Sequence, residues 1–137
     1  MPISPIYSRT IQIPASAIDE NGHVNNVTYV QWMQDIAVEH YAAIGGIQAQ
    51  GPDATWVVRE HKIEYLLPAF EGEEIEIRTW VEDIRRVRSL RKYEFVRKGD
   101  GKVLVKGETD WVFVDAKTGR PLAIPEEVTK VFENPSP

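Results

Sequence analysis

The sequence contains no cysteine, which excludes disulfide bonds, thiolate metal ligands and a cysteine nucleophile together. A chain without cysteine suits a reducing compartment, so we expect a cytoplasmic location. The sequence also has no apolar run long enough to span a bilayer, and its first residues do not resemble a secretory signal. We therefore expect neither a membrane partner nor a fold that depends on covalent cross-links.

An excess of positive charge is also missing, because the formal net charge is −5. Nucleic-acid binding depends mainly on neutralising phosphates, so an acidic chain of this size is a poor candidate for it. The basic residues are nevertheless uneven along the chain, and five of them fall between positions 85 and 92: Arg85, Arg86, Arg88, Arg91 and Lys92. We expect no nucleic-acid partner and a local positive patch at this cluster.

Several catalytic signatures are absent as well. The sequence has no Gly-x-Ser-x-Gly elbow, no phosphate-binding glycine loop and no dinucleotide-binding glycine pattern. Its three histidines, His23, His40 and His61, lie far apart and without the spacing of metal ligands. We expect an activity that needs no metal and no bound cofactor.

The length of the chain is that of one ordinary domain, over residues 1–137, and its hydrophobic pattern predicts the helices and strands of that domain. Apolar residues recur at steps of three and four from Val27 to Ile44, which predicts one long, largely buried helix that ends at the pair Gly45–Gly46. An earlier strand is predicted over residues 6–13. Period-two patterns predict later strands over 56–67, 73–84, 89–98 and 102–114, and residues 125–132 favour a short final helix.

This order of elements predicts an α+β architecture, with a five-stranded antiparallel sheet wrapped around the long helix. The late strands are joined by short turns, which implies that neighbours in sequence are antiparallel neighbours in the sheet. A single helix cannot cover such a sheet fully, and one edge strand stays open. We therefore expect a symmetric homodimer built edge to edge, or a tetramer of two such dimers.

The loop before the long helix carries the polar groups that are capable of chemistry. Asp19, Asn21 and His23 occupy alternate positions, which share one side in an extended or looped segment. A carboxylate can act as a base or a nucleophile, and a histidine can move protons near neutral pH. An asparagine can hold a water or a carbonyl oxygen.

The start of the helix offers a further group that can assist a reaction. The first N–H groups of a helix have no internal partner and lie at its positive end, so the N–H groups near Asn25 and Asn26 can stabilise an oxyanion. Hydrolysis of esters, thioesters and amides forms such an oxyanion. Asp, Asn and Gly are also ordinary turn and cap residues, and a purely structural loop is the competing interpretation.

The run from Asp19 to Tyr29, Asp-Glu-Asn-Gly-His-Val-Asn-Asn-Val-Thr-Tyr, followed by Trp32, resembles the hot-dog-fold thioesterases. It is most similar to the acyl-ACP thioesterases and to the 4-hydroxybenzoyl-CoA thioesterase-like group. The resemblance implies that the chain hydrolyses acyl-CoA or acyl-ACP. It implies that Asp19 is the base or nucleophile, that Asn21 and His23 are further catalytic residues, and that the N–H of Asn26 is the oxyanion donor.

The sequence departs from the plant acyl-ACP enzymes in two respects. Those enzymes carry two tandem hot-dog repeats, whereas this chain has one, so a dimer is expected to complete its site. They also place an acid and a cysteine after the helix, where the nearest residues here are Pro68 and Ala69. A smaller catalytic set centred on Asp19 is therefore expected.

The arginine cluster has two interpretations. Arg85, Arg86, Arg88 and Arg91 can bind the phosphates of coenzyme A or the acidic surface of a carrier protein, because arginine pairs well with phosphate. They can equally be surface charges at a solvated turn.

Two other functions on the same fold compete with hydrolysis. One is an acyl-thioester hydratase or dehydratase, which carries a proline and one more residue between the asparagine and the histidine, whereas Gly22 alone separates them here. The other is a protein that binds acyl thioesters without turning them over.

Overall fold

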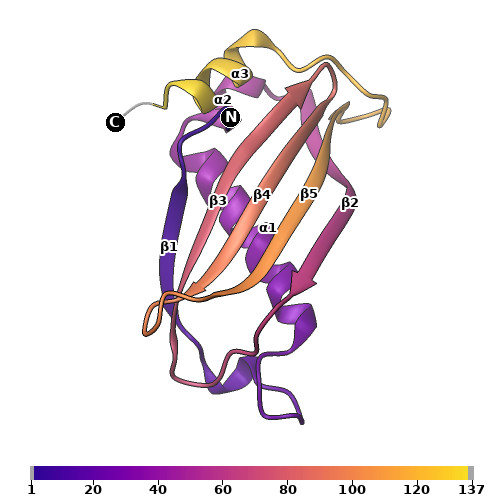
Figure 1. Ribbon diagram of the computed structural model, residues 1–137. Coiled ribbons are helices and arrows are strands. Elements are labelled where there is room, and N and C mark those ends of the chain that lie inside the picture. The colour runs from indigo at the N-terminus through magenta and orange to yellow at the C-terminus, as the bar shows by residue number, and fades with distance from the viewer. Residues whose placement is uncertain (1, 136–137) are drawn as a thin grey trace.

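One long helix, α1 (Asn26–Ala43), lies diagonally across one face of a curved five-stranded antiparallel sheet in the computed structural model, which describes residues 2–135 (Figure 1). The strands lie in the order β1-β3-β4-β5-β2, with bounds β1 Tyr7–Gln12, β2 Ala54–Tyr65, β3 Glu74–Arg85, β4 Arg88–Arg97 and β5 Val103–Asp115. The predicted α+β class and the central helix are confirmed.

The pairing of β2 differs from the prediction. The hairpins β3–β4 and β4–β5 form as expected, but β2 pairs with β5 at the edge of the sheet and not with β3. The prediction that all four late strands pair in sequence order is therefore wrong at this step. Residues 66–73 form a connection long enough to carry the chain from one side of the sheet to β3, which then pairs with β1 on its other side.

The helix α1 begins and ends where local chemistry requires it. The side chain of Asn25 accepts a hydrogen bond from the N–H of Val27 at 2.9 Å and caps the first turn. Gly45 adopts a positive φ of 84° just after the helix, a conformation that favours glycine. A second short helix, α2 (Gly46–Gln50), follows directly and was not predicted from the glycine pair.

The helix buries one face and not most of its surface, so the prediction of a largely buried helix is wrong. Tyr29, Met33, Ile36, Ala37 and His40 are buried. The other face of α1 is exposed and includes two apolar side chains, Val27 and Val38, which are 73% and 58% exposed. These two valines belong to the apolar pattern of the helix but are not buried. The pattern therefore predicts more buried surface than α1 has within one chain.

Two apolar clusters hold the layers together. In the larger one, Met33 of α1 packs against strand residues such as Phe95 and Val105, all three of them fully buried. In the smaller one, α3 (Glu126–Glu133) inserts Val128 and Phe132 beside Val81 near the end of α1. No helix within residues 2–135 is both long enough and apolar enough to cross a membrane.

Candidate active site at the start of α1

The loop from Asp19 to His23 is a tight turn closed by a bridge between Ile18 and Val24. The N–H of Asp19 donates to the carbonyl of His23 at 3.0 Å, and residues opposite each other in such a pair share one side. The turn requires a positive φ of 81° at Gly22. Asp19 and His23 are therefore brought together by a tight turn within the loop that the sequence predicted.

Asn21 lies at the exposed tip of this turn. Its backbone N–H donates to Oδ1 of Asp19 at 2.9 Å, so it orients the carboxylate through its main chain. The catalytic role of the Asn21 side chain stays a prediction, because the contact with Asp19 is made by the main chain.

The reactive side chains of the turn remain available. Asp19 uses only Oδ1 in a hydrogen bond, and within the described chain its Oδ2 has no partner. The imidazole of the half-buried His23 likewise has no side-chain hydrogen bond to any described residue. A carboxylate oxygen that is free in this way can accept a proton from water or attack a carbonyl carbon.

The start of α1 leaves one backbone donor uncommitted. Asn25 accepts from the N–H of Val27 through its side chain and from the N–H of Thr28 through its carbonyl, at 2.9 and 3.0 Å. The N–H of Asn26 donates to no group between residues 2 and 135. This N–H lies at the positive end of the helix, where an oxyanion is stabilised.

Three hydrogen bonds hold this turn and the helix start in place. The N–H of Val24 donates to the carbonyl of Ala69, and the N–H of Asn25 donates to the carbonyl of Ala17, both at 2.9 Å. The hydroxyl of Tyr65, at the end of β2, donates to the carbonyl of Asn26 at 3.1 Å. Ala69, one of the two residues nearest to the acid and cysteine positions of the plant enzymes, thus lies beside the turn and supplies a backbone carbonyl.

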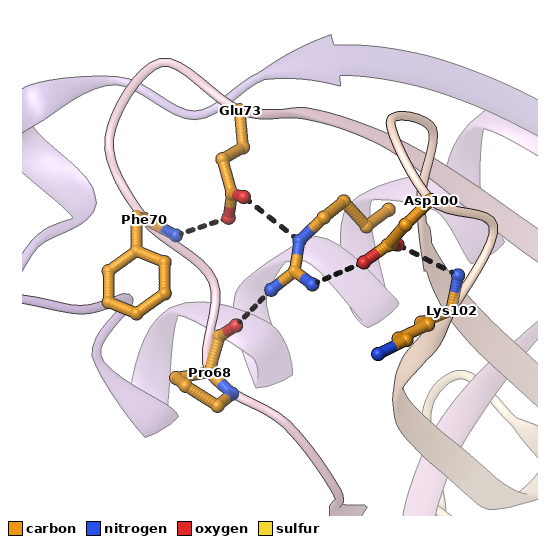
Figure 2. Close-up of polar contacts among 6 residues, drawn as sticks. Pro68, Phe70, Glu73, Asp100 and Lys102 are labelled. Carbon is orange, nitrogen blue, oxygen red and sulfur yellow. Dashed lines mark hydrogen bonds and ion pairs between the residues drawn. The ribbon is translucent and has the colours of Figure 1, made fainter.

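Arg97, which was not predicted from the sequence as a site residue, holds the β2–β3 connection that contains Ala69 in place. The guanidinium of Arg97 donates to the carbonyl of Pro68 at 2.7 Å and forms ion pairs with Glu73 and Asp100 at 2.9 Å each (Figure 2). Glu73 in turn accepts from the N–H of Phe70 at 2.8 Å. The chain from Pro68 to Glu73 is therefore held at both ends, and nothing in the spacing of these residues signals it.

Tyr29, one turn into α1, is buried, and burial raises the pKa of its phenol to about 12. The neighbouring Tyr65 and Glu73 raise this pKa further, and Arg97 opposes them. Tyr29 is therefore neutral near pH 7 and packs against Phe95, with ring centroids 5.0 Å apart. Tyr29 is therefore not a candidate base of this site.

The β3–β4 turn, near which the exposed arginines of the cluster lie, is at the opposite end of the sheet from the loop before α1 (Figure 1). Arg85 ends β3, Arg86 lies in the β3–β4 turn, and Arg88 forms an ion pair with Asp110. The twelve residues of β3 separate this turn from the connection beside Asp19, a span of roughly 40 Å. Within one chain these arginines cannot contact a substrate held at Asn26.

Arg91 is not part of that surface, and its assignment to an exposed phosphate-binding patch is wrong. It lies three residues after Arg88 on β4, so it points to the opposite face of the sheet. Only 3% of Arg91 is exposed, and its Nη1 donates to Nδ1 of His40 at 2.8 Å and to Oγ1 of Thr79 at 3.1 Å.

Comparison with known proteins agrees with this description. Residues 13–132 match the model of the thioesterase-like superfamily, and the chain belongs to that family. The predicted enzyme class, an acyl thioester hydrolase, is confirmed at this family level. No curated protein matches the sequence.

Solved structures show the same fold at low sequence identity. A 1,4-dihydroxy-2-naphthoyl-CoA thioesterase from Synechocystis superposes with a TM-score of 0.82 at 14% identity, over 95% of this chain and 97% of its own. A Staphylococcus aureus protein solved in complex with CoA gives 0.83 at 17%, over 98% and 87%. The 12:0-ACP thioesterase from Umbellularia californica gives 0.82 at 19%, over 91% of this chain but 48% of its own.

Proposed function

We propose that this protein hydrolyses acyl thioesters of coenzyme A or acyl carrier protein to a free acid and a thiol. The observation that carries the proposal is the uncommitted N–H of Asn26 at the positive end of α1, next to a turn that presents Asp19 with a free carboxylate oxygen. An oxyanion donor and a base held on one fixed segment are the two groups that this reaction needs.

In the proposed reaction the thioester carbonyl oxygen accepts a hydrogen bond from the N–H of Asn26. Asp19 takes a proton from a water that attacks the carbonyl carbon, or it attacks directly and forms an anhydride that water then cleaves. The carbon–sulfur bond breaks, and the thiolate leaves with a proton from His23 or from water. Asn21 positions the carboxylate, and no metal or bound cofactor takes part.

A homodimer would bring the arginines to the site. Among the described strands β2 and β1 form the edges, and the β2 edge carries exposed apolar side chains, Val57 and Tyr65, whereas the exposed residues of β1 are polar. A two-fold antiparallel pairing of β2 edges would place the β3–β4 turn of one protomer near the Asp19 end of its partner. Arg85 and Arg86 would then be available to the phosphates of coenzyme A.

Similar proteins support this substrate class but leave the carrier and acyl group open. Two of them are named as thioesterases of an aromatic acyl-CoA and of 12:0-ACP, and a third was solved with CoA bound. A cytoplasmic location is part of the same proposal and rests on the cysteine-free sequence.

The direct experiment is thiol release from a panel of short, long and aromatic acyl-CoA esters, repeated on acyl-ACP. Release with a clear preference supports the proposal and identifies the acyl group. An enoyl thioester that loses its double-bond absorbance without thiol release would identify a hydratase instead. Tight binding of every thioester with no turnover on either carrier would identify a binding protein.

A further inference from the structure

A positive charge is enclosed between the sheet and the helices with no negative charge beside it. Arg91 is 3% exposed, and no carboxylate between residues 2 and 135 lies within 4.0 Å of its guanidinium. Its Nη1 is used by His40 and Thr79, while its Nε and Nη2 donate to no described residue. A buried charge without a partner destabilises a fold, so such a group indicates a missing anion.

The groups that face Arg91 do not remove this charge. His40 accepts through Nδ1, and burial together with the Arg91 charge lowers the pKa of its imidazole to about 3. Burial also lowers the pKa of Arg91, but only to about 10, so the guanidinium is cationic near pH 7. The ring of Phe132 lies with its centroid 5.9 Å from the guanidinium carbon and carries no net charge.

Arg91 forms part of the wall of a cavity of about 310 Å³, which lies between the second half of α1, the helices α2 and α3, and the sheet. The remaining wall includes four aromatic side chains, those of Tyr41, Trp56, Trp111 and Phe132. This region is at the end of α1 near α2 and α3 in Figure 1, away from the Asp19 turn.

Neighbouring residues of α2 hold the Tyr41 ring in this wall. A Cβ at position 46 would lie 2.2 Å from the Tyr41 ring, so Gly46 allows the ring to rest on α2. The Tyr41 hydroxyl donates to Oε1 of Gln50 at 2.7 Å, and the ring meets Trp56 edge to face at 6.1 Å.

We propose that this cavity binds a small organic acid, with the carboxylate paired to the free N–H groups of Arg91 and the apolar body against the aromatic wall. The planar guanidinium fork matches a carboxylate and accounts for arginine at this position. A volume of about 310 Å³ is at the lower end of pockets for small ligands, so the site suits a compact acid and is too small for coenzyme A.

This site is separate from the proposed oxyanion donor in the same chain. His40, which contacts Arg91, lies fourteen residues beyond Asn26 on α1, a distance of roughly 21 Å along the helix axis. Acid binding can therefore be measured without turnover, and it does not depend on the proposed hydrolysis.

The test compares 3-phenylpropionate with its neutral amide, 3-phenylpropionamide, by titration calorimetry on the unmodified protein. We expect the acid to bind at least tenfold more tightly than the amide. Histidine ring NMR on the same samples locates the ligand, because among His23, His40 and His61 only His40 contacts Arg91. Equal affinities, or acid-induced shifts at His23 or His61 but not at His40, would overturn the proposal.

The matched variants are Arg91→Met and Arg85→Met. Arg91→Met removes the charge and keeps the bulk of the side chain, so the preference for the acid is expected to vanish while weak binding of the amide remains. Arg85→Met removes an exposed arginine outside the cavity, and it should keep the full preference. An Arg91→Met protein that still prefers the acid tenfold would refute the site. If that variant does not fold, the His40 shifts in the unmodified protein decide the question.

The acid could be a free ligand or the acyl part of a substrate. Phenylpropionate that inhibits thiol release competitively with acyl-CoA would place the acyl group in this cavity. Binding at His40 without competition would assign the cavity to a free acid. Both results require the Arg91 contact, whereas a failure of thiol release altogether would leave the calorimetry and NMR results unaffected.

Discussion

The backbone N–H of Val24 donates to the carbonyl oxygen of Ala69 over 2.9 Å, and this bond joins the candidate catalytic turn to the connection between β2 and β3. The preceding carbonyl, that of Pro68, accepts from Arg97. The position of Asp19 and of the helix start therefore depends on a side chain that lies outside the loop itself.

Replacing Arg97 with methionine is expected to reduce both stability and turnover. Loss of its two ion pairs and its bond to Pro68 should lower the free energy of unfolding by about 1–3 kcal/mol. If the connection also positions the turn, kcat should fall by roughly tenfold, a cost of about 1.4 kcal/mol in the barrier.

Urea denaturation and thiol release measure the two effects of Arg97→Met, with Arg120→Met, which replaces an exposed arginine outside both proposed sites, as the control. Arg97→Lys should recover part of kcat, because it restores a donor for one partner. A variant that loses stability but keeps full kcat would limit Arg97 to a structural role.

Asn25→Ala is expected to lower the free energy of unfolding by about 1 kcal/mol, because the N–H of Val27 loses its cap. Asn25→Asp keeps a side-chain acceptor at the helix start and should stay close to the unmodified protein. Urea denaturation midpoints at constant m-value measure the difference. Equal losses in both variants would mean that Asn25 acts through something other than its cap.

Stability is expected to fall as the pH falls from about 6.5 toward 3, because of His40. Its pKa is lowered to about 3 in the folded chain, so between these values the unfolded chain binds more protons than the folded one. The free energy of unfolding should then drop by up to about 1.4 kcal/mol per pH unit from this group.

The His40 contribution is the difference between the pH slopes of the unmodified protein and His40→Gln between pH 6 and 4.5. His61, whose pKa burial also lowers, is present in both proteins and cancels. Identical slopes would contradict a neutral, buried His40.

Gly46→Ala is expected to destabilise the chain by about 1–3 kcal/mol, because the new Cβ would overlap the Tyr41 ring at 2.2 Å. Adding Tyr41→Ala removes the ring, so the alanine at position 46 should then cost much less. A double-mutant cycle in urea gives this coupling. Additive losses would show that the two residues do not interact.

Much of the fold follows from local pattern. Alternation places Ile75, Ile77 and Val81 on the buried face of β3, and the three- and four-residue steps of α1 predict the helix to within one residue at each end. The position of β2 at the sheet edge beside β5 could not be predicted from the local pattern. Strand pairing depends on which surfaces meet in three dimensions and not on sequence order.

Only part of the candidate site could be predicted from the sequence. The motif predicts Asp19, His23 and the start of α1 as parts of the site. The groups that hold them in place are backbone carbonyls, such as that of Ala69, or distant side chains such as Arg97, and these carry no local sequence signal. Arg91 was misplaced because the arginine cluster was considered as one patch. The period of two along β4 already separates Arg88 from Arg91.

The measurement that tests the central claim most directly is thiol release by Asp19→Asn on the preferred acyl thioester, with folding checked by urea denaturation. The amide keeps an oxygen for the N–H of Asn21 but cannot act as a base or nucleophile. The account predicts a loss of at least about a hundredfold in kcat/KM, the scale of a lost general base. Turnover equal to that of the unmodified protein, in a folded variant, would contradict it.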